Sequence, residues 1–300
     1  MYGVTVNFDE LVSLKRQISA KTFKPHHQTH RLGEHLSSFR GQGMSFSEVR
    51  HYQAMDDVRH MEWRVTARTG KPHIKVFQEE LERPVIIVGD FNPSMYFGTK
   101  VAFKSVMAAR LAALIGWQVI EEGDKIGALL YTNYQTTELK PHGRKQGILP
   151  LLKALTDITM PTHTTQHPIA LMSLLPRLKA MIRPGAMIVI LSDGYQIEDS
   201  TLRQLRYMGK ACDIIFYHIL DATEIETPAK GCYPISDGAH TLLFDTHQSN
   251  VQESYQEACL DRINRLKKCC LETKIAYHLI QPSDNPSICI KHTFPRRHHG

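Results

Sequence analysis

The 300-residue sequence lacks any apolar run of the roughly 20 residues that a membrane helix requires. Its clearest apolar runs, 85–88 and 186–191, have the length of buried strands. The first ten residues include Asp9 and Glu10 and show no charged-then-apolar pattern, so we expect no secretory signal. These absences predict a cytoplasmic protein without a membrane span.

Paired cysteines are also absent. The chain has six cysteines, but none forms a Cys-x-x-Cys motif, and the adjacent Cys269 and Cys270 are poorly placed to share a zinc ion. Free thiols in a reducing compartment are therefore expected, in agreement with the cytoplasm.

The sequence also lacks the glycine-rich motifs that cradle phosphates, both Gly-x-x-x-x-Gly-Lys-Ser/Thr and Gly-x-Gly-x-x-Gly. This argues against nucleotide binding. The net charge of +6 is mild, and acidic residues are interspersed with the basic ones, so no nucleic-acid-binding tail is indicated.

What the sequence does contain, from residue 84 onward, is an alternation of strands and helices. Strands are predicted at 84–89, 125–131, 186–191, 212–219 and 275–280, with helices at 100–121, 146–158, 168–181, 200–208 and 251–271. Such alternation implies right-handed crossovers and helices on both faces of a sheet. We therefore predict an α/β domain over 81–285 with an open, doubly wound, mainly parallel sheet.

The flanking regions read differently. We expect an N-terminal appendage over 1–80, with a short helix at 8–20 and a strand at 74–78, and a polar tail over 286–300. Within the α/β domain, the Pro- and Gly-containing stretch 224–240 reads as a long loop before a short strand at 240–244.

Polar side chains follow two of the predicted strands where each ends. Asp90, Asn92 and Ser94 come after the first strand at alternate positions, and Asp193 follows the strand at 186–191. A threonine-rich segment, 162–165, precedes a helix. A single Asp at such a place is more often a turn or cap residue. Ligands of open α/β sheets bind at this edge, however, and these oxygens suit Mg²⁺.

Two resemblances bear on these residues. The run Asp90-Phe91-Asn92-Pro93-Ser94 resembles the Asp-x-Ser-x-Ser motif of a metal-ion-dependent adhesion site in a von Willebrand factor A domain. The preceding segment resembles the signature of the bacterial family called domain of unknown function 58, most densely over 40–98. The residues that carry this second resemblance are Arg40-Gly41-Gln42-Gly43, Phe46, Glu48, Arg50, Tyr52, Asp56-Asp57, Arg59, Trp63-Arg64, Ala67-Arg68 and Lys75.

The resemblance implies a role for each site residue. Asp90 and Asp193 would hold Mg²⁺ or Mn²⁺ mainly through waters, while Ser94 and Thr165 would ligate it directly, with Thr164 as the alternative to Thr165. An ion held by so few direct carboxylates would take an acidic side chain from a partner as its last ligand. Members of the family are often encoded beside MoxR-type AAA ATPases and are thought to act with them in protein maturation or complex assembly.

The sequence departs from the family pattern at two places. Asn92 stands where the family has serine, and its longer amide would have to shift to fit the tight octahedron of Mg²⁺. The usual glycines before the threonine are replaced by His163 and Thr164. Both departures leave it open whether the metal site is kept.

The segment 40–75 interleaves arginines with acids. Bidentate guanidinium–carboxylate pairs can lock such a segment in place, which would make Trp63 and Tyr52 core or anchor residues. The functional alternative is a partner-docking surface that includes Arg50, Arg59, Trp63 and Arg68. The interleaved acids oppose contact with nucleic-acid phosphates.

The function predicted from the sequence is a non-enzymatic protein-binding or adaptor protein with a variant metal-ion-dependent adhesion site. The family resemblance implies that it acts with a MoxR-type AAA ATPase in protein maturation or complex assembly. Asp90 and Asp193 are expected at the surface. The alternative is a metal-dependent phosphohydrolase of the haloacid dehalogenase type with Asp90 as nucleophile. That chemistry needs a general acid at position 92, and Asn92 cannot donate a proton in that role. We therefore expect no catalytic residues.

Overall fold

The computed structural model describes residues 3–18, 44–53, 56–79, 83–160, 167–236 and 241–293. Contacts within the chain divide it into two units. The smaller unit is His27–Glu82, and the larger unit combines Met1–His26 with Arg83–Gly300.

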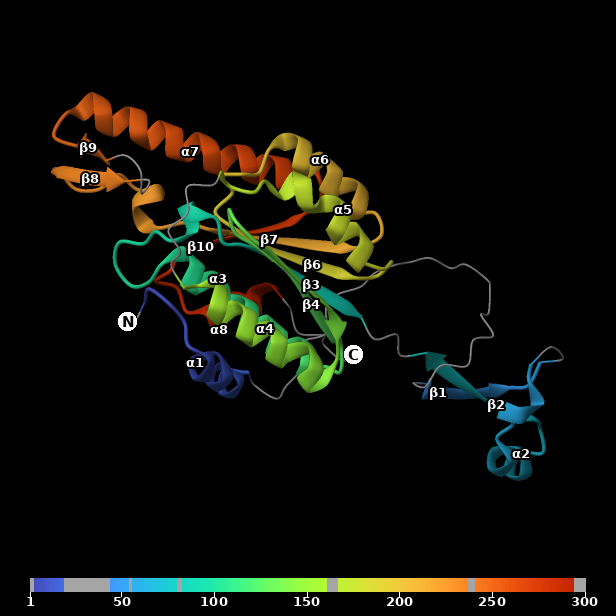
Figure 1. Ribbon diagram of the computed structural model, residues 1–300. Helices are drawn as coiled ribbons and strands as arrows, with labels where there is room; N and C mark the ends of the chain where they lie inside the picture. The colour runs from blue at the N-terminus through green and yellow to red at the C-terminus, as the bar shows by residue number, and fades with distance from the viewer. Residues whose placement is uncertain are drawn as a thin grey trace. The chain divides into compact units, whose positions relative to one another are not determined.

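The larger unit is built on a six-stranded sheet with the strand order β10-β7-β6-β3-β4-β5 (Figure 1). All neighbours are parallel except β5, which runs antiparallel to β4. The predicted α/β fold with a mainly parallel sheet is confirmed. The strands are β3 (Pro84–Asp90), β4 (Lys125–Tyr131), β5 (Thr136–His142), β6 (Met187–Ser192), β7 (Asp213–Ile219) and β10 (Ala276–Ile280).

Helices cover both faces of this sheet. One apolar core lies between the sheet and α1 (Phe8–Ser13), α3 (Lys104–Glu121), α4 (Arg144–Ile158) and α8 (Pro286–Thr293). A second core lies between the other face and α5 (Leu171–Met181), α6 (Asp199–Met208) and α7 (Ser249–Glu272). The continuous apolar runs of β3 and β6 reflect burial on both sides.

Helix α3 is buried around most of its circumference because it packs on the sheet and also against α1, α4 and α8. In α1, Leu11 is buried, and Leu14 is buried in the 3-10 turn that follows it. The Trp117 indole of α3 donates a hydrogen bond to the Leu11 carbonyl (3.0 Å). The first 18 residues therefore belong to the α/β unit, whereas the sequence analysis assigned them to the appendage.

Two further elements differ from the sequence-based expectation. A hairpin of β8 (Cys232–Ser236) and β9 (Thr241–Asp245) includes part of the predicted long loop. Helix α8 occupies 286–293, where a polar tail was expected, and it buries Ile290 and half-buries Cys289 against the core. Residues 294–300 lie outside the described part of the chain.

The smaller unit pairs β1 (Met44–His51) with β2 (His73–Glu79) antiparallel and carries the short helix α2 (Trp63–Thr69) between them. Arg50 forms a bidentate pair with Asp56 at 2.9 and 2.6 Å, and Lys75 pairs with Glu62 at 2.6 Å. The locking role predicted for the charged residues is thus seen for these pairs. Trp63 is 69% exposed, which excludes the core position and is compatible with the alternative position on a docking surface.

Candidate functional site at the loop edge

The candidate site lies at the carboxyl ends of β3 and β6. The chain leaves β3 toward β4 and β5 on one side of the sheet and later returns to β6 on the other side, so the strand order reverses between these two neighbours. Asp90 is the last residue of β3, and Asp193 directly follows β6. The segments 90–99 and 192–195 are called the loop edge below. Such a reversal point is where open α/β sheets bind ligands.

Asp90 is fully buried, contrary to the expected surface position. Its Oδ1 accepts hydrogen bonds from the backbone N–H and the side-chain amide of Asn92 (3.0 and 2.8 Å), and its Oδ2 accepts one from the Ser192 hydroxyl (2.8 Å). Burial, and to a lesser degree the negative charge of Asp193, raise the pKa of Asp90 to about 7, against the opposing effect of these hydrogen bonds. Burial beside the same carboxylates raises the pKa of Tyr131 well above its usual range.

Asn92 joins the loop edge to a distant segment. Its amide nitrogen donates to Asp90 and to the Ile169 carbonyl (2.9 Å), and its amide oxygen accepts from the Ile169 N–H (3.0 Å). The reverse orientation of the amide would set its oxygen against two acceptors, so the network fixes which atom faces Asp90. Asn92 therefore presents a donor to Asp90 rather than an oxygen to an ion.

Asp193 is also fully buried, and its charge is balanced by a side chain that the sequence analysis did not single out. The Lys104 ammonium, at the start of α3 and only 1% exposed, lies 2.9 Å from Asp193 Oδ2 and 2.8 Å from Glu224 Oε1. Burial opposes the charged form of Lys104, but the two carboxylates outweigh it and raise its pKa. The buried and charged Lys104 ammonium thus lies next to Asp193 at the loop edge.

His218, in β7, contacts the backbone of Asp193. Its Nε2 lies 2.9 Å from the Asp193 carbonyl oxygen and its Nδ1 lies 2.8 Å from the Tyr277 hydroxyl. A carbonyl only accepts, so Nε2 carries the proton and Nδ1 accepts from Tyr277. Burial lowers the pKa of His218 to about 4, which keeps the ring neutral.

Above the buried charges, aromatic side chains are open to solvent. Phe97 and Tyr195, 40% and 48% exposed, flank the Lys104 ammonium with ring centroids at 5.8 and 5.5 Å. The Arg262 guanidinium of α7 lies 3.9 Å from the Tyr195 ring centroid. On the same loop as Phe97, Val101 is 58% exposed. The solvent-exposed side chains of the loop edge are therefore apolar and aromatic, and the side chains buried beneath them are charged.

The described donors fit a divalent ion poorly. The Asp90 oxygens are both engaged, the Asn92 oxygen faces the Ile169 N–H, and the Lys104 ammonium would repel a second cation beside Asp193. Ser94 is half-buried at the loop edge. Thr165 and its alternative Thr164 lie outside the described residues. We therefore derive no role for Mg²⁺ or Mn²⁺ here.

Sequence reasoning missed Lys104, Glu224 and the Thr99–Asp221 contact, although the sequence contained two signals for them. Asp221 and Glu224 form a capping box directly after β7. Asp221 also accepts hydrogen bonds from the Thr99 N–H and hydroxyl (2.9 and 2.7 Å), which ties the loop after β7 to the loop edge. A lone lysine at the start of the apolar helix α3 was the corresponding signal for Lys104.

The other predicted docking residues lie in the smaller unit. Arg59, Trp63 and Arg68 are exposed, and Arg50 is engaged with Asp56. This surface remains a second candidate for partner binding.

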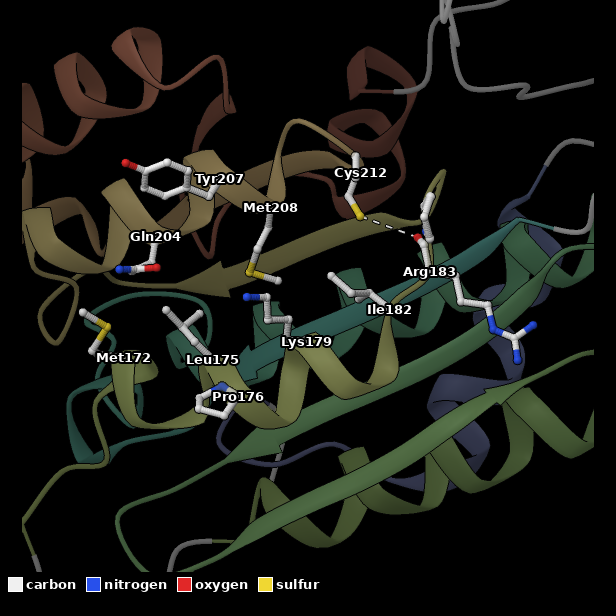
Figure 2. A pocket seen from close by; sticks show the side chains of 12 residues that line it. Met172, Leu175, Pro176, Lys179, Ile182, Arg183, Gln204, Tyr207, Met208 and Cys212 are labelled. Atoms are coloured by element: carbon white, nitrogen blue, oxygen red, sulfur yellow. Dashed lines mark hydrogen bonds between the residues drawn. The ribbon is translucent and has the colours of Figure 1, made fainter. Parts of the chain in front are cut away.

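A groove of about 570 Å³ lies between α5 and α6, near the amino ends of β6 and β7 and thus away from the loop edge (Figure 2). Its lining is mostly apolar, with Leu175, Met208 and Cys212 beside Lys179 and Arg183. The Cys212 thiol contacts the Arg183 carbonyl (3.6 Å), and burial raises its pKa. The raised pKa makes this thiol a poor nucleophile.

Residues 48–264 match the family described as "Protein of unknown function DUF58". The chain belongs to this family. Uncharacterized proteins of Mycobacterium bovis and Mycobacterium tuberculosis are 30% identical to it over 205 residues, which are 68% of this chain and 64% of each relative. The DUF58 chain thus spans less than two thirds of the length of these relatives.

Two solved structures resemble the chain distantly. The conserved hypothetical protein BatB from Bacteroides thetaiotaomicron aligns at 13% identity with a TM-score of 0.40, over 70% of this chain and 96% of BatB. An uncharacterized membrane spanning protein from Vibrio fischeri aligns at 14% identity with a TM-score of 0.25, over 71% and 96%. In the described part of this DUF58 chain, no helix combines the length and apolarity needed to cross a membrane.

Proposed function

We propose that this DUF58 protein is a von Willebrand factor A-like, non-enzymatic docking domain of the cytoplasm that binds a protein partner through its loop edge. One observation carries the proposal: the polar groups of the loop edge bind one another, while Phe97 and Tyr195 are presented to solvent directly above them. Polar groups that bind one another in this way serve to position the loops. Exposed aromatic side chains beside an arginine are the residue types that dominate binding energy at protein interfaces.

A MoxR-type AAA ATPase, or a client of such an ATPase, is the proposed partner. The support for this choice is the resemblance of the segment 40–98 to a family whose members are often encoded beside these ATPases. Docking would not depend on Mg²⁺ at the loop edge, because Lys104 already supplies the positive charge next to Asp193.

The phosphohydrolase alternative has less support. A nucleophilic Asp90 would need one free carboxylate oxygen in line with a phosphate, but Asp90 is fully buried and each of its oxygens accepts a hydrogen bond. Asn92 donates to Asp90 and has no proton to give to a leaving group.

Direct binding to the purified MoxR-type ATPase of the same genome, by biolayer interferometry, tests the proposal. The double variant Phe97→Ser/Tyr195→Ser should weaken binding by about tenfold or more, as expected for two central aromatic contacts. Tyr207→Ser is the matched control, because Tyr207 is 65% exposed on α6, away from the loop edge. Circular dichroism checks the fold of each variant.

Two results would revise the proposal in different ways. If the double variant binds as tightly as the wild type, the loop edge is not the docking surface, and Arg59, Trp63 and Arg68 become the candidates. If the wild-type protein does not bind the ATPase at all, the choice of partner is wrong.

A further inference from the structure

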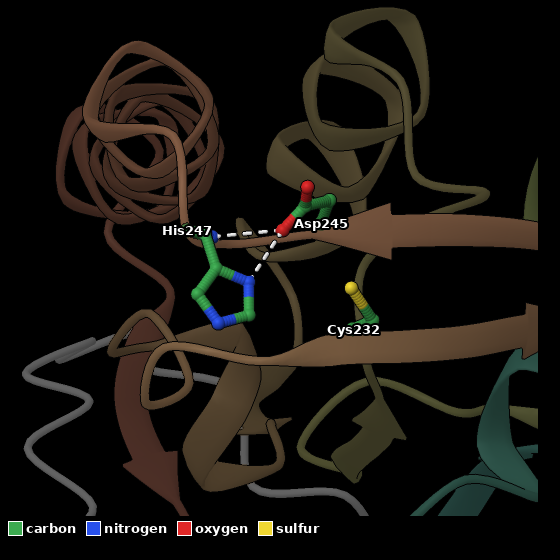
Figure 3. Close-up of side chains that lie close together, drawn as sticks. All are labelled: Cys232, Asp245 and His247. Atoms are coloured by element: carbon green, nitrogen blue, oxygen red, sulfur yellow. Dashed lines mark hydrogen bonds and ion pairs between the residues drawn. The ribbon is translucent and has the colours of Figure 1, made fainter.

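The β8–β9 hairpin gathers three metal-ligating side chains outside the loop edge (Figure 3). Cys232, Asp245 and His247 each place one ligand atom within 4.8 Å of the others. Within the described ranges, no other group of three His, Cys, Asp or Glu side chains comes together in this way. The cluster supplies a sulfur, an oxygen and a nitrogen donor, the three donor types that Zn²⁺ accepts in proteins.

Backbone geometry holds these side chains in place before any ion binds. Cys232 and Asp245 are directly opposite each other in the antiparallel register of the hairpin, so their side chains lie on the same face. Asp245 Oδ1 accepts the backbone N–H of His247 (3.0 Å) and lies 2.8 Å from its Nδ1, which fixes the imidazole beside the carboxylate. The Cys232 thiol also donates a hydrogen bond to the Asp245 carboxylate, so the carboxylate contacts both of the other donors.

The hairpin itself is anchored to the larger unit. The Phe244 ring packs on Tyr255 of α7 at a centroid distance of 4.9 Å. The Thr246 hydroxyl accepts the Gly231 N–H (2.9 Å), which closes the base of the hairpin next to Cys232. Cys232 is exposed and the His247 side chain is 60% exposed, so an ion can reach the three donors from solvent.

We propose that Cys232, Asp245 and His247 form a Zn²⁺ site on the β8–β9 hairpin, with the fourth position of the tetrahedron open to water or to a ligand from a partner. Three protein ligands leave the fourth position open, whereas closed structural zinc sites use four protein ligands. Zinc binding exchanges the thiol proton of Cys232 for a zinc–sulfur bond, and the proton passes to solvent. No oxidation or reduction is involved. Affinity should therefore fall as the pH is lowered.

Titration of the purified, chelator-treated full chain with Co²⁺ tests this site, because a cobalt–thiolate bond produces a charge-transfer absorption that other ligands do not. The wild type should develop this absorption at one equivalent of Co²⁺ and lose it when Zn²⁺ is added. Cys232→Ser should abolish it. His247→Ala and Asp245→Asn should each weaken Co²⁺ binding by more than about tenfold, since losing a residue that only orients a ligand already has an effect of this size.

Cys269→Ser is the matched control. The Cys269 thiol lies 3.8 Å from Asp199 Oδ1, so it shares the thiol–carboxylate contact, yet it belongs to no three-donor group among the described residues. This variant should bind Co²⁺ like the wild type. The proposal is overturned if the wild type shows no thiolate absorption, if the absorption persists in Cys232→Ser, or if binding is unchanged in all three ligand variants, which would indicate an adventitious ion only.

Discussion

Replacing Lys104 with methionine should destabilise the protein far more than the loss of an ordinary lysine. Lys104 is 1% exposed and lies within 2.9 Å of two carboxylates, so its removal leaves Asp193 buried without a counter-charge and leaves Glu224 with only the Arg262 guanidinium, 3.8 Å away. Breaking a buried ion pair in this way costs about 3–5 kcal/mol, against about 0–1 kcal/mol for a surface pair. For a unit of this size the melting temperature should fall by on the order of 10 °C.

Differential scanning calorimetry at several pH values measures this effect. The loss of stability in Lys104→Met should become smaller at lower pH, because a proton bound by the two carboxylates would replace the missing positive charge. Lys100→Met is the matched control, since Lys100 is exposed on the loop just before α3, and it should change stability by less than about 1 kcal/mol. The triple variant Lys104→Met/Asp193→Asn/Glu224→Gln should recover most of the loss. If Lys104→Met has the same melting temperature as the wild type, Lys104 does not stabilise the two buried carboxylates as inferred.

Three further predictions concern the carboxylates and the ion. The pKa of Asp90 in the folded protein, about 7, lies above the ordinary 3.8. The free energy of unfolding should therefore fall by on the order of 4 kcal/mol as the pH rises from about 4 to about 7. In chemical denaturation, Asp90→Asn should show a flatter dependence of stability on pH over this range. Isothermal titration with Mg²⁺ or Mn²⁺ should give no heat of binding at the loop edge in either the wild type or Asn92→Ser, because Lys104 remains beside Asp193 in both proteins. A saturable heat of binding that disappears in Asp193→Asn would contradict this prediction. Assays with aryl phosphates should show no hydrolysis, and turnover that is lost in Asp90→Asn would restore the phosphohydrolase hypothesis.

The sheet was predictable from the sequence because β3 and β6 are continuous apolar runs, a pattern that burial on both faces imposes. The same logic placed Asp90 and Asp193 at one edge. Their burial was not predictable, because it depends on Lys104, Ser192 and other partners from segments far away in sequence.

Two of the elements that sequence reasoning missed, β8 and α8, are short and carry proline. Pro234 interrupts the pattern of β8, which forms only a two-stranded hairpin where a missing N–H is tolerated. Pro286 stands at the first position of α8, where its fixed φ favours a helix start, but eight residues give too little periodicity to recognise. The sequence left the position of Trp63 open, because an aromatic residue among arginines is compatible with either a core or a surface.

The buried ammonium group has a consequence for how sequences of this family can change. Lys104 is 89 residues from Asp193 and 120 from Glu224, so the three positions look unrelated along the chain. Losing Lys104 deprives both buried carboxylates of positive charge, and losing either carboxylate removes one of the two partners of a buried ammonium, so a single substitution is harmful even when the replacement is similar in size. Viable relatives should keep all three or replace them together, and positions 104, 193 and 224 should vary as one unit in an alignment.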